Sequence, residues 1–574
     1  MAIFTFDESH MLGRVREVDT RKVSLLVNSD EDLRKARVGQ LVALQLSGGV
    51  ESWLIGIIDK VIKSVDTTTD VLNGGDLGGT EVVNTVRLTL VGSVKWDAVA
   101  AKAIFSRSLV HVPEIESQCH VLCDKQLENF MNLLTAAGDL QHSLNLGVYT
   151  LDENAKAFLD GNKLFQRHAA LLGSTGSGKS WTIAAILEQA AKLPSSNLIV
   201  FDLHGEYRKL SYARHLRIPG PEELGTSSDE LLYLPYWLLN AEEMQAMFID
   251  RSEFSAHNQV MAFQDTVVEL KKSTLTKLSK NAVLAAFTLD SPIPFSINEV
   301  LKKLNSLNEE MTEGARGLKQ GQFYGQFSRL LTRLKSKLSD KRYGFLFQAP
   351  ESEHQYDAMA KTVIRLMDHA TSGAQVKVID FSEVPSDILP VIVGLVARMI
   401  YQVQFWTDHE KRRPLAFVCD EAHLYLPTKE GLNPVERRAI EAFEKIAKEG
   451  RKYGVALLIV SQRPADVSAT ILSQCNNVIA LRLTNAADQA TVKKLMPESL
   501  ESLLDVLPIM DIGEALVVGD AVLLPSRIKI DPPQEKPLSA TIDFWTKWQE
   551  SADATDFEQA VENMRRQSRN IHEA

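Results

Sequence analysis

A glycine-rich stretch at residues 173–180, Gly-Ser-Thr-Gly-Ser-Gly-Lys-Ser, has the composition and spacing of a phosphate-binding loop. An apolar run at 169–172 precedes it and a helix-like run at 181–190 follows it, which is the order that such a loop requires. Glycines let successive backbone N–H groups converge on one anion, and the N-terminus of the following helix adds partial positive charge. We therefore predict that ATP is bound by Gly173, Ser174, Thr175, Gly176, Ser177, Gly178, Lys179 and Ser180.

Lys179 and Ser180 supply the two side chains that phosphate chemistry needs. The Lys179 ammonium is predicted to reach the β- and γ-phosphates, and the Ser180 hydroxyl is predicted to bind Mg²⁺. The alternative is a glycine turn that contains Lys-Ser by chance. The flanking strand and helix patterns argue against that alternative.

Two adjacent carboxylates follow a second apolar run, residues 414–419. Asp420 is predicted to complete the Mg²⁺ shell, as a Walker B carboxylate does. Glu421 is predicted to act as the general base that orients a water molecule toward the γ-phosphate. An apolar run ending in Asp-Glu is a weak signal alone, but it is a strong one after a phosphate-binding loop in the same α/β pattern.

Polar residues also follow two further apolar runs. The run at 197–203 contains Asp202 and precedes His204 and Glu206, which we expect to support the metal site or else to lie in a solvated loop. The run at 455–460 precedes Gln462, which is predicted to sense the γ-phosphate or position water. The carboxyl ends of parallel strands form the ligand-binding edge of such sheets.

The order of these patterns predicts an α/β fold with a RecA-like P-loop ATPase core, an N-terminal small β-barrel and a helical insertion. The barrel lacks an aromatic stacking platform, which favours a role in assembly over oligonucleotide binding. The predicted boundaries are 1–95 for the barrel, 96–145 for a connecting segment, 146–235 and 341–535 for the core, 236–340 for the insertion and 536–574 for a tail.

The insertion contains a local excess of basic residues. Arg329, Arg333 and Lys335 lie in a stretch without acidic residues, and they are candidates for DNA binding. A solvated face of an amphipathic helix over 327–335 is the favoured alternative.

The composition of the whole chain is that of a soluble multidomain protein. The 574 residues carry a net charge of -11, which argues against a surface coated with nucleic acid but allows a local basic channel. Four cysteines suggest a reducing compartment. The apolar stretch at 388–397 is too short to span a membrane and is predicted to be a buried helix. We expect a cytoplasmic protein without a membrane anchor.

Taken together, the motifs at 171–180, 201–207, 418–423, 449–454 and 461–464 resemble those of the HerA family of the HerA/FtsK hexameric DNA translocase ATPases. The resemblance implies a homohexamer with ATP sites between subunits and DNA in the central pore. It also implies that a neighbouring subunit supplies an arginine finger. Arg451 best matches that position, Arg463 and Arg437 are rivals, and Arg167 resembles a further arginine near the nucleotide.

The same resemblance implies a function and a partner. Relatives act with separate nucleases or sirtuin-like effectors, so the expected function is ATP-driven DNA translocation or unwinding in DNA end processing or anti-phage defence. The alternative is a ring-shaped scaffold that activates an effector enzyme, with ATP binding mainly structural. The identity of such an effector does not follow from the sequence.

Overall fold

The computed structural model describes residues 3–46, 52–67, 80–97, 102–137, 143–150, 152–314, 317–367, 374–428, 431–432, 434–539, 543–549 and 557–567. The chain forms two compact units. The first comprises Met1–Ile186, Ser461–Ala465 and Leu472–Pro533, and the second comprises Leu187–Val460, Asp466–Ile471 and Gln534–Ala574.

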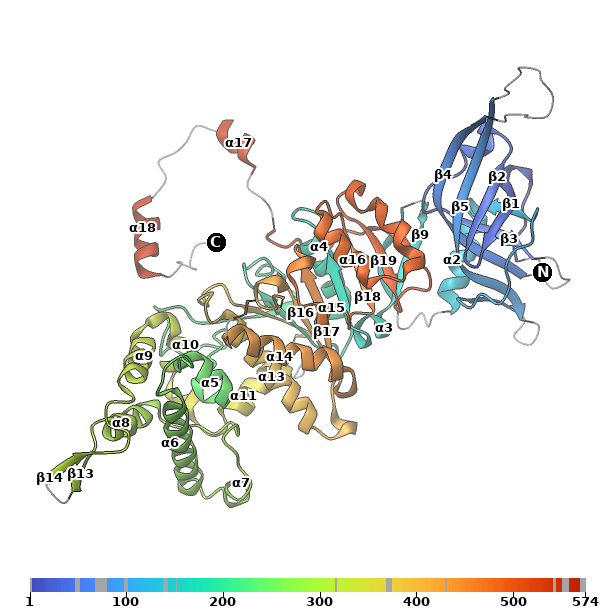
Figure 1. Cartoon of the computed structure of the whole chain (residues 1–574). Helices are drawn as coiled ribbons and strands as arrows, with labels where there is room; N and C mark the ends of the chain where they lie inside the picture. The colour runs from blue at the N-terminus through green and yellow to red at the C-terminus, as the bar shows by residue number, and fades with distance from the viewer. Residues whose placement is uncertain are drawn as a thin grey trace. The chain divides into compact units, whose positions relative to one another are not determined.

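The first unit begins with a closed β-barrel (Figure 1). Six strands close it in the order β2-β1-β7-β3-β4-β5, with β2 paired to β5 and an extra strand, β6, on β5. Alternate residues such as Val23, Leu25 and Val27 point into its core. The strands are β1 (Met11–Asp19), β2 (Lys22–Val27), β3 (Leu41–Gln45), β4 (Ser52–Thr67), β5 (Thr80–Asp97), β6 (Lys102–Ser106) and β7 (Gln118–Val121), with the short helix α1 at Asp30–Leu33.

The predicted barrel is therefore present, but its strands continue beyond the predicted boundary at residue 95. Strand β7 lies between β1 and β3 and completes the closure. Because β6 and β7 have only five and four residues, they are too short to show a clear alternation in the sequence. Helix α2 (Asp124–Ala137) packs Leu127 and Phe130 against the same domain.

The remainder of the first unit contains the strand that leads into the glycine-rich loop. Its strands lie in the order β10-β18-β19-β20-β8-β9, with β10 and β18 parallel and the other pairs antiparallel. Strand β8 is paired on both sides, with β20 and with β9. The elements are β8 (Ser143–Tyr149), β9 (Asp152–Asp160), α3 (Gly161–Gln166), β10 (Ala169–Leu172), β18 (Asn477–Ala480), α16 (Ala486–Leu495), β19 (Glu514–Gly519) and β20 (Ser526–Ile530). Helix α4 (Lys179–Ala191) begins in the first unit and ends in the second, and α15 (Ala469–Leu472) begins in the second unit and ends in the first.

A parallel sheet forms the centre of the second unit, with strand order β12-β15-β11-β16-β17. Every residue of β11, β15 and β16 is buried, as expected for parallel strands covered on both faces. This α/β arrangement agrees with the predicted core. The elements are β11 (Leu198–Asp202), β12 (Ala213–Arg217), β15 (Val376–Asp380), α13 (Leu389–Trp406), β16 (Leu415–Cys419), α14 (Pro434–Glu449) and β17 (Val455–Ser461).

Helix α13 contains the apolar stretch predicted as a buried helix. It is the one helix of the described residues that is long and apolar enough to cross a membrane, and 72% of it is buried inside the protein. Gly394 allows its close approach to α14, because a side chain there would come within 2.9 Å of the Ala439 backbone.

The insertion is mainly helical, as predicted, and carries one hairpin that the sequence did not indicate. Helices α6 and α8 pack side by side, and α9 packs on α8 (Figure 1). The elements are α5 (Ala241–Phe248), α6 (Ala256–Lys277), α7 (Asn281–Leu284), α8 (Ile297–Asn308), β13 (Met311–Gly314), β14 (Gly317–Gln320), α9 (Ser328–Ser339), α10 (Gly344–Phe347) and α11 (Ala358–Met367); the tail carries α17 (Phe544–Gln549) and α18 (Phe557–Arg566).

Candidate nucleotide-binding site

The glycine-rich loop connects the buried strand β10 to helix α4, as the sequence predicted. Gly176 and Gly178 have φ angles of 73° and 106°, values that glycine adopts far more readily than other residues. A side chain at Gly173 would lie 2.5 Å from the Ser177 hydroxyl and 2.7 Å from Leu481. The backbone of the loop therefore depends on glycine at these three positions.

Neighbouring segments of the first unit hold this loop in place. The Ser174 N–H donates to the Arg482 carbonyl at 2.9 Å, and the Gly513 N–H donates to the Ser177 carbonyl at 3.1 Å. Lys179 is 8% exposed, and its ammonium donates to the Ser174 carbonyl at 3.1 Å. The lysine thus lies across the loop, where a phosphate anion would compete for its charge.

Gln462 lies against the same loop. The Thr175 hydroxyl donates a hydrogen bond to the Gln462 side-chain carbonyl, although the two residues are 287 positions apart. The preceding residue, Ser461, accepts the Gly173 N–H through its carbonyl at 3.2 Å. The structure therefore brings the predicted γ-phosphate sensor to the predicted phosphate loop.

The paired acids directly follow strand β16 in the second unit. Asp420 is buried, and Glu421 has φ 45° and ψ 43°, a left-handed conformation that is uncommon for residues other than glycine and often marks functional sites. The His423 imidazole lies 3.4 Å from the Glu421 carboxylate.

The electrostatics of Asp420 suit a divalent cation. Burial raises the pKa of the Asp420 carboxyl to about 7, and the negative charges of Glu421 and Glu206 add to this effect. A bound cation reverses such a shift because it stabilises the ionised form. The donor set is thus chemically appropriate for Mg²⁺, which prefers oxygen ligands.

Asp202, at the end of β11, organises the loop that follows it. Its carboxylate accepts the N–H groups of the next residues, with distances of 3.2, 2.8 and 3.1 Å to Oδ1 and 3.0 Å to Oδ2 for His204, Gly205, Glu206 and Tyr207, respectively. Burial raises the pKa of Asp202, and these N–H groups oppose that effect.

The three residues predicted to support the metal site therefore have different environments. Asp202 shapes a loop, Glu206 adds negative charge near Asp420, and the His204 side chain is exposed. Tyr207 belongs to the motif at 201–207, from which the sequence predicts no role for this side chain. Its hydroxyl donates to Asp420 Oδ2 at 2.8 Å, a contact that local spacing could not reveal.

The candidate arginine fingers are all exposed in the described chain. Arg451 lies in a 3-10 turn (Gly450–Tyr453), Arg437 on α14 and Arg463 just after Gln462. Exposure leaves each of them available to another copy of the chain.

Arg167 does not lie beside the glycine-rich loop of its own chain, contrary to the simplest form of the prediction. It precedes β10, whereas the loop follows β10, and its guanidinium lies 3.5 Å from the Asp520 carboxylate. A strand rises about 3.3 Å per residue, so the four residues of β10 separate the two positions. A nucleotide contact by Arg167 would have to come from another copy.

The three basic residues on α9 also separate into two kinds. Arg333 donates to Glu253 at 2.7 Å and to the Phe248 carbonyl at 3.0 Å, whereas Arg329 and Lys335 are exposed. Leu330, Leu331 and Leu334 are buried on the opposite face. The helix is amphipathic, as predicted, and only part of its basic face is open to a ligand.

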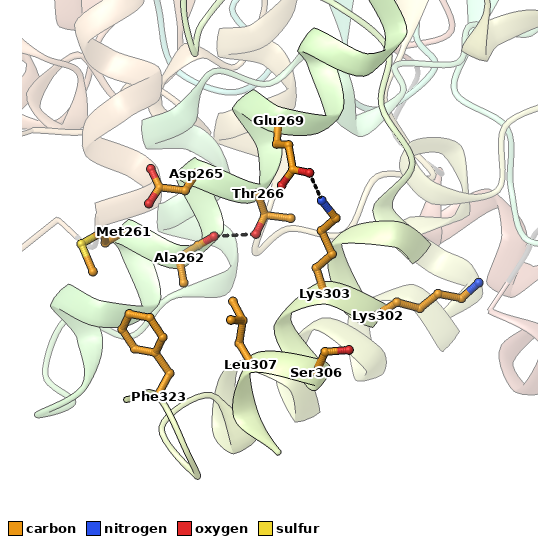
Figure 2. Close-up of a pocket in the computed structure, with 10 residues that line it drawn as sticks. All are labelled: Met261, Ala262, Asp265, Thr266, Glu269, Lys302, Lys303, Ser306, Leu307 and Phe323. Atoms are coloured by element: carbon orange, nitrogen blue, oxygen red, sulfur yellow. Dashed lines mark hydrogen bonds and ion pairs between the residues drawn. The ribbon is translucent and has the colours of Figure 1, made fainter. Parts of the chain in front are cut away.

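The insertion also has a hollow between α6 and α8, which contains none of the predicted site residues (Figure 2). Lys303 on α8 forms an ion pair with Glu269 on α6, and the Thr266 hydroxyl donates to the Ala262 carbonyl. Met261, Leu307 and Phe323 supply apolar surface at its other end. The hollow lacks the glycine-rich backbone that characterises the phosphate loop.

The fold and the glycine-rich loop define the class of protein: a P-loop ATPase. Two family profiles refine this class, "Helicase HerA, central domain" over residues 144–400 and "Helicase HerA-like C-terminal" over residues 389–531. The chain belongs to the HerA helicase family.

Similar proteins include the "Probable DNA double-strand break repair helicase HerA" of Methanocaldococcus jannaschii, 26% identical over 532 residues, which cover 87% of this chain and 92% of that protein. The "DNA double-strand break repair helicase HerA" of Pyrococcus furiosus is 26% identical over 418 residues, covering 67% of this chain and 69% of that protein.

Among solved structures, VirB4 of Thermoanaerobacter pseudethanolicus matches with a TM-score of 0.44 and 18% identity, covering 69% of this chain and 97% of VirB4. The plasmid coupling protein TrwB in complex with ADP and Mg²⁺ matches with a TM-score of 0.42 and 13% identity, covering 68% of this chain and 90% of TrwB.

Proposed function

We propose that this ATPase is a hexameric DNA translocase or helicase that acts with a separate nuclease or other effector, in DNA end processing or anti-phage defence. The observation that carries the motor part is the hydrogen bond between Thr175 of the phosphate loop and Gln462. It gives the loop a neighbour that can report whether the γ-phosphate is present. A purely structural nucleotide site has no need of such a sensor.

In this proposal, the loop N–H groups and Lys179 would hold the phosphates, while Ser180 and Asp420 would hold Mg²⁺. The cation supplies charge neutralisation on the phosphate oxygens. Glu421 orients a water molecule and accepts its proton as the water oxygen bonds to the γ-phosphorus and ADP leaves. Gln462 would respond to the loss of the γ-phosphate, and its contacts would transmit this change to Thr175 and to the end of strand β17.

Family membership and the exposed arginines support the proposal of a ring. We propose that Arg451 of one subunit completes the ATP site of its neighbour, with Arg463 and Arg437 as rivals. A guanidinium supplied in this way stabilises charge in the transition state. Arg167 would likewise act on a neighbouring subunit's nucleotide.

DNA is the proposed substrate of translocation, and it would pass through the pore of the ring. Arg329 and Lys335 are the exposed cations of α9 that support a contact with the phosphate backbone. We place the protein in the cytoplasm, where DNA is accessible to it.

In a second candidate function, the ring is a scaffold that activates an effector. An exposed apolar surface on the barrel supports this function. The loop between β6 and β7 exposes Val110, Val112 and Ile115, with exposed fractions of 76%, 52% and 58%. Such a group of apolar side chains is typical of a protein interface. Retained effector activation by an ATPase-deficient Glu421→Gln ring would support this function over translocation.

The experiment that tests the main proposal measures ATP hydrolysis with and without duplex DNA, together with the proteins that co-purify. We expect hydrolysis that duplex DNA stimulates and that Lys179→Ala abolishes through loss of nucleotide binding. Hydrolysis that does not respond to any duplex, over a range of salt concentrations, would contradict the translocase function.

A further inference from the structure

Tyr207 is a fully buried residue whose hydroxyl is directed at a functional carboxylate. It is 0% exposed, and its hydroxyl donates to Asp420 Oδ2 at 2.8 Å across a sequence separation of 213 residues. A phenylalanine would fill the same volume. What the tyrosine adds over phenylalanine is therefore the hydrogen bond from its hydroxyl to Asp420.

The loop that carries Tyr207 is fixed independently of Asp420. Four consecutive N–H groups, those of His204 to Tyr207, converge on the Asp202 carboxylate. Gly205 has φ 71°, and a side chain there would lie 2.4 Å from Arg208, which is itself paired with Asp380. A loop held in this way fixes the backbone position from which the Tyr207 side chain extends.

The other atoms of Asp420 are held by its own segment. Oδ1 accepts the Glu421 N–H at 2.9 Å, and the main-chain carbonyl accepts the Tyr425 hydroxyl at 3.0 Å. The contact from Tyr207 thus provides the hydrogen bond to the second carboxylate oxygen. Without it the carboxylate could rotate about its terminal bond, and Oδ2 would lose a buried partner.

We infer that Tyr207 is a positioning residue that fixes the Asp420 carboxylate in the orientation required for Mg²⁺. This inference rests on the proposed function, because it needs Asp420 to be a Mg²⁺ ligand. In this inference, Tyr207 acts through its contact with Asp420. One accepted hydrogen bond leaves each carboxylate oxygen with lone-pair capacity for a further ligand.

The test uses the full chain and measures binding rather than turnover. Fluorescent mant-ADP is titrated at increasing Mg²⁺ concentration with the wild-type protein and with Tyr207→Phe. We expect Tyr207→Phe to raise the Mg²⁺ concentration for half-maximal enhancement of binding by about 10-fold or more, as the loss of one hydrogen bond to a charged group predicts. Binding of mant-ADP in EDTA should stay unchanged.

A matched control is Tyr236→Phe. Tyr236 is also buried, and its hydroxyl donates to the Phe295 carbonyl in the insertion. This variant should lower the melting temperature without changing the Mg²⁺ requirement. If both tyrosine variants raised the required Mg²⁺ concentration equally, the effect of Tyr207→Phe would be explained by a general loss of stability. That result would overturn the inference.

Asp420→Asn separates failure of the inference from failure of the proposed function. If Asp420→Asn leaves the Mg²⁺ requirement unchanged, the metal assignment itself is wrong. If Asp420→Asn shifts it and Tyr207→Phe does not, only the positioning role is wrong. In the double variant, Tyr207→Phe should have no added effect on Mg²⁺ dependence, because the two residues act through one contact.

A second variant, Asp202→Asn, tests the same contact if Tyr207→Phe folds poorly. Asp202→Asn weakens the set of N–H contacts that hold the loop and should raise the Mg²⁺ requirement in the same direction. A folded Asp202→Asn protein with a wild-type Mg²⁺ requirement would contradict the inference.

Discussion

At the scale of single residues, the contact between Thr175 and Gln462 predicts a specific kinetic defect. Gln462→Ala removes the side chain that the Thr175 hydroxyl contacts, and we expect kcat for ATP to fall about 10²-fold, as for loss of a transition-state donor. The affinity for ADP should change little, because ADP lacks the γ-phosphate that Gln462 is proposed to sense. Steady-state hydrolysis and ADP titrations measure the two quantities.

Thr175→Ser is the matched control for this prediction, because it keeps a hydroxyl at the same position. It should retain most of the wild-type kcat. A Gln462→Ala protein that lost affinity for ADP as strongly as it lost kcat would show that Gln462 shapes the loop instead of sensing the phosphate.

The candidate site was predictable from sequence where the chemistry is local. Glycine spacing revealed the phosphate loop, and an apolar run revealed Asp420 and Glu421. The role of Tyr207 was not predictable, because its partner lies 213 residues away and the residue resembles any buried aromatic. The ion pair of Arg333 was not predictable for the same reason: its partner Glu253 belongs to another segment of the insertion.

At the scale of elements, residues 535–538, where the core meets the tail, are joined to the loop after β11. The Leu538 N–H donates to the Glu206 carbonyl at 2.6 Å, and the Ser211 N–H donates to Glu535 at 2.5 Å. We predict that Glu535→Ala increases amide hydrogen exchange across residues 204–211, since this loop then loses an external support.

Glu558→Ala is the control for that measurement, because Glu558 is an exposed acidic residue of the same tail on α18. It should leave exchange at 204–211 unchanged. Equal exchange in wild type and Glu535→Ala would show that the Asp202 contacts alone define the loop.

Helix α9 supports a second prediction at this scale. Arg333→Ala breaks the contacts to Glu253 and Phe248 and should cost about 1 to 2 kcal/mol of folding stability, because a charged hydrogen bond is lost at a half-buried position. Chemical unfolding measures this loss.

Arg329→Glu combined with Lys335→Glu should instead leave stability nearly unchanged. If α9 contacts DNA, this double variant lowers DNA affinity and reduces the dependence of binding on salt by about one unit per lost phosphate contact. Unchanged affinity and salt dependence would identify the two residues as a solvated face.

Short and irregular elements explain the differences between the predicted and observed folds. The long apolar runs of β11, β16 and β17 were predictable because both of their faces are buried. Strand β7 has four residues, and the hairpin β13–β14 has four in each strand and is exposed. Such elements are defined by pairing partners and leave little periodicity in the sequence.

At the scale of the whole molecule, a ring with shared sites predicts complementation between subunits. Arg451→Ala should lower ATP hydrolysis about 10³-fold or more if this residue is the arginine finger. Mixed with Glu421→Gln subunits, it should regain measurable activity, because its intact site then faces a neighbour with an intact arginine. ATPase assays over a series of mixing ratios measure this.

Arg437→Ala and Arg463→Ala provide the comparison for the mixing experiment. Complementation by one of them, with none by Arg451→Ala, would move the finger to that residue. Absence of complementation for all three would contradict an ATP site shared between subunits.

The central claim is that Glu421 is the base of an ATP-hydrolysing motor site, and single-turnover hydrolysis by Glu421→Gln tests it most directly. With radiolabelled ATP, Mg²⁺ and duplex DNA, this variant should bind ATP as tightly as the wild type and hydrolyse it at least about 10²-fold more slowly. Bound ATP that persists through many wild-type turnovers is the predicted result. Hydrolysis at the wild-type rate would contradict the account.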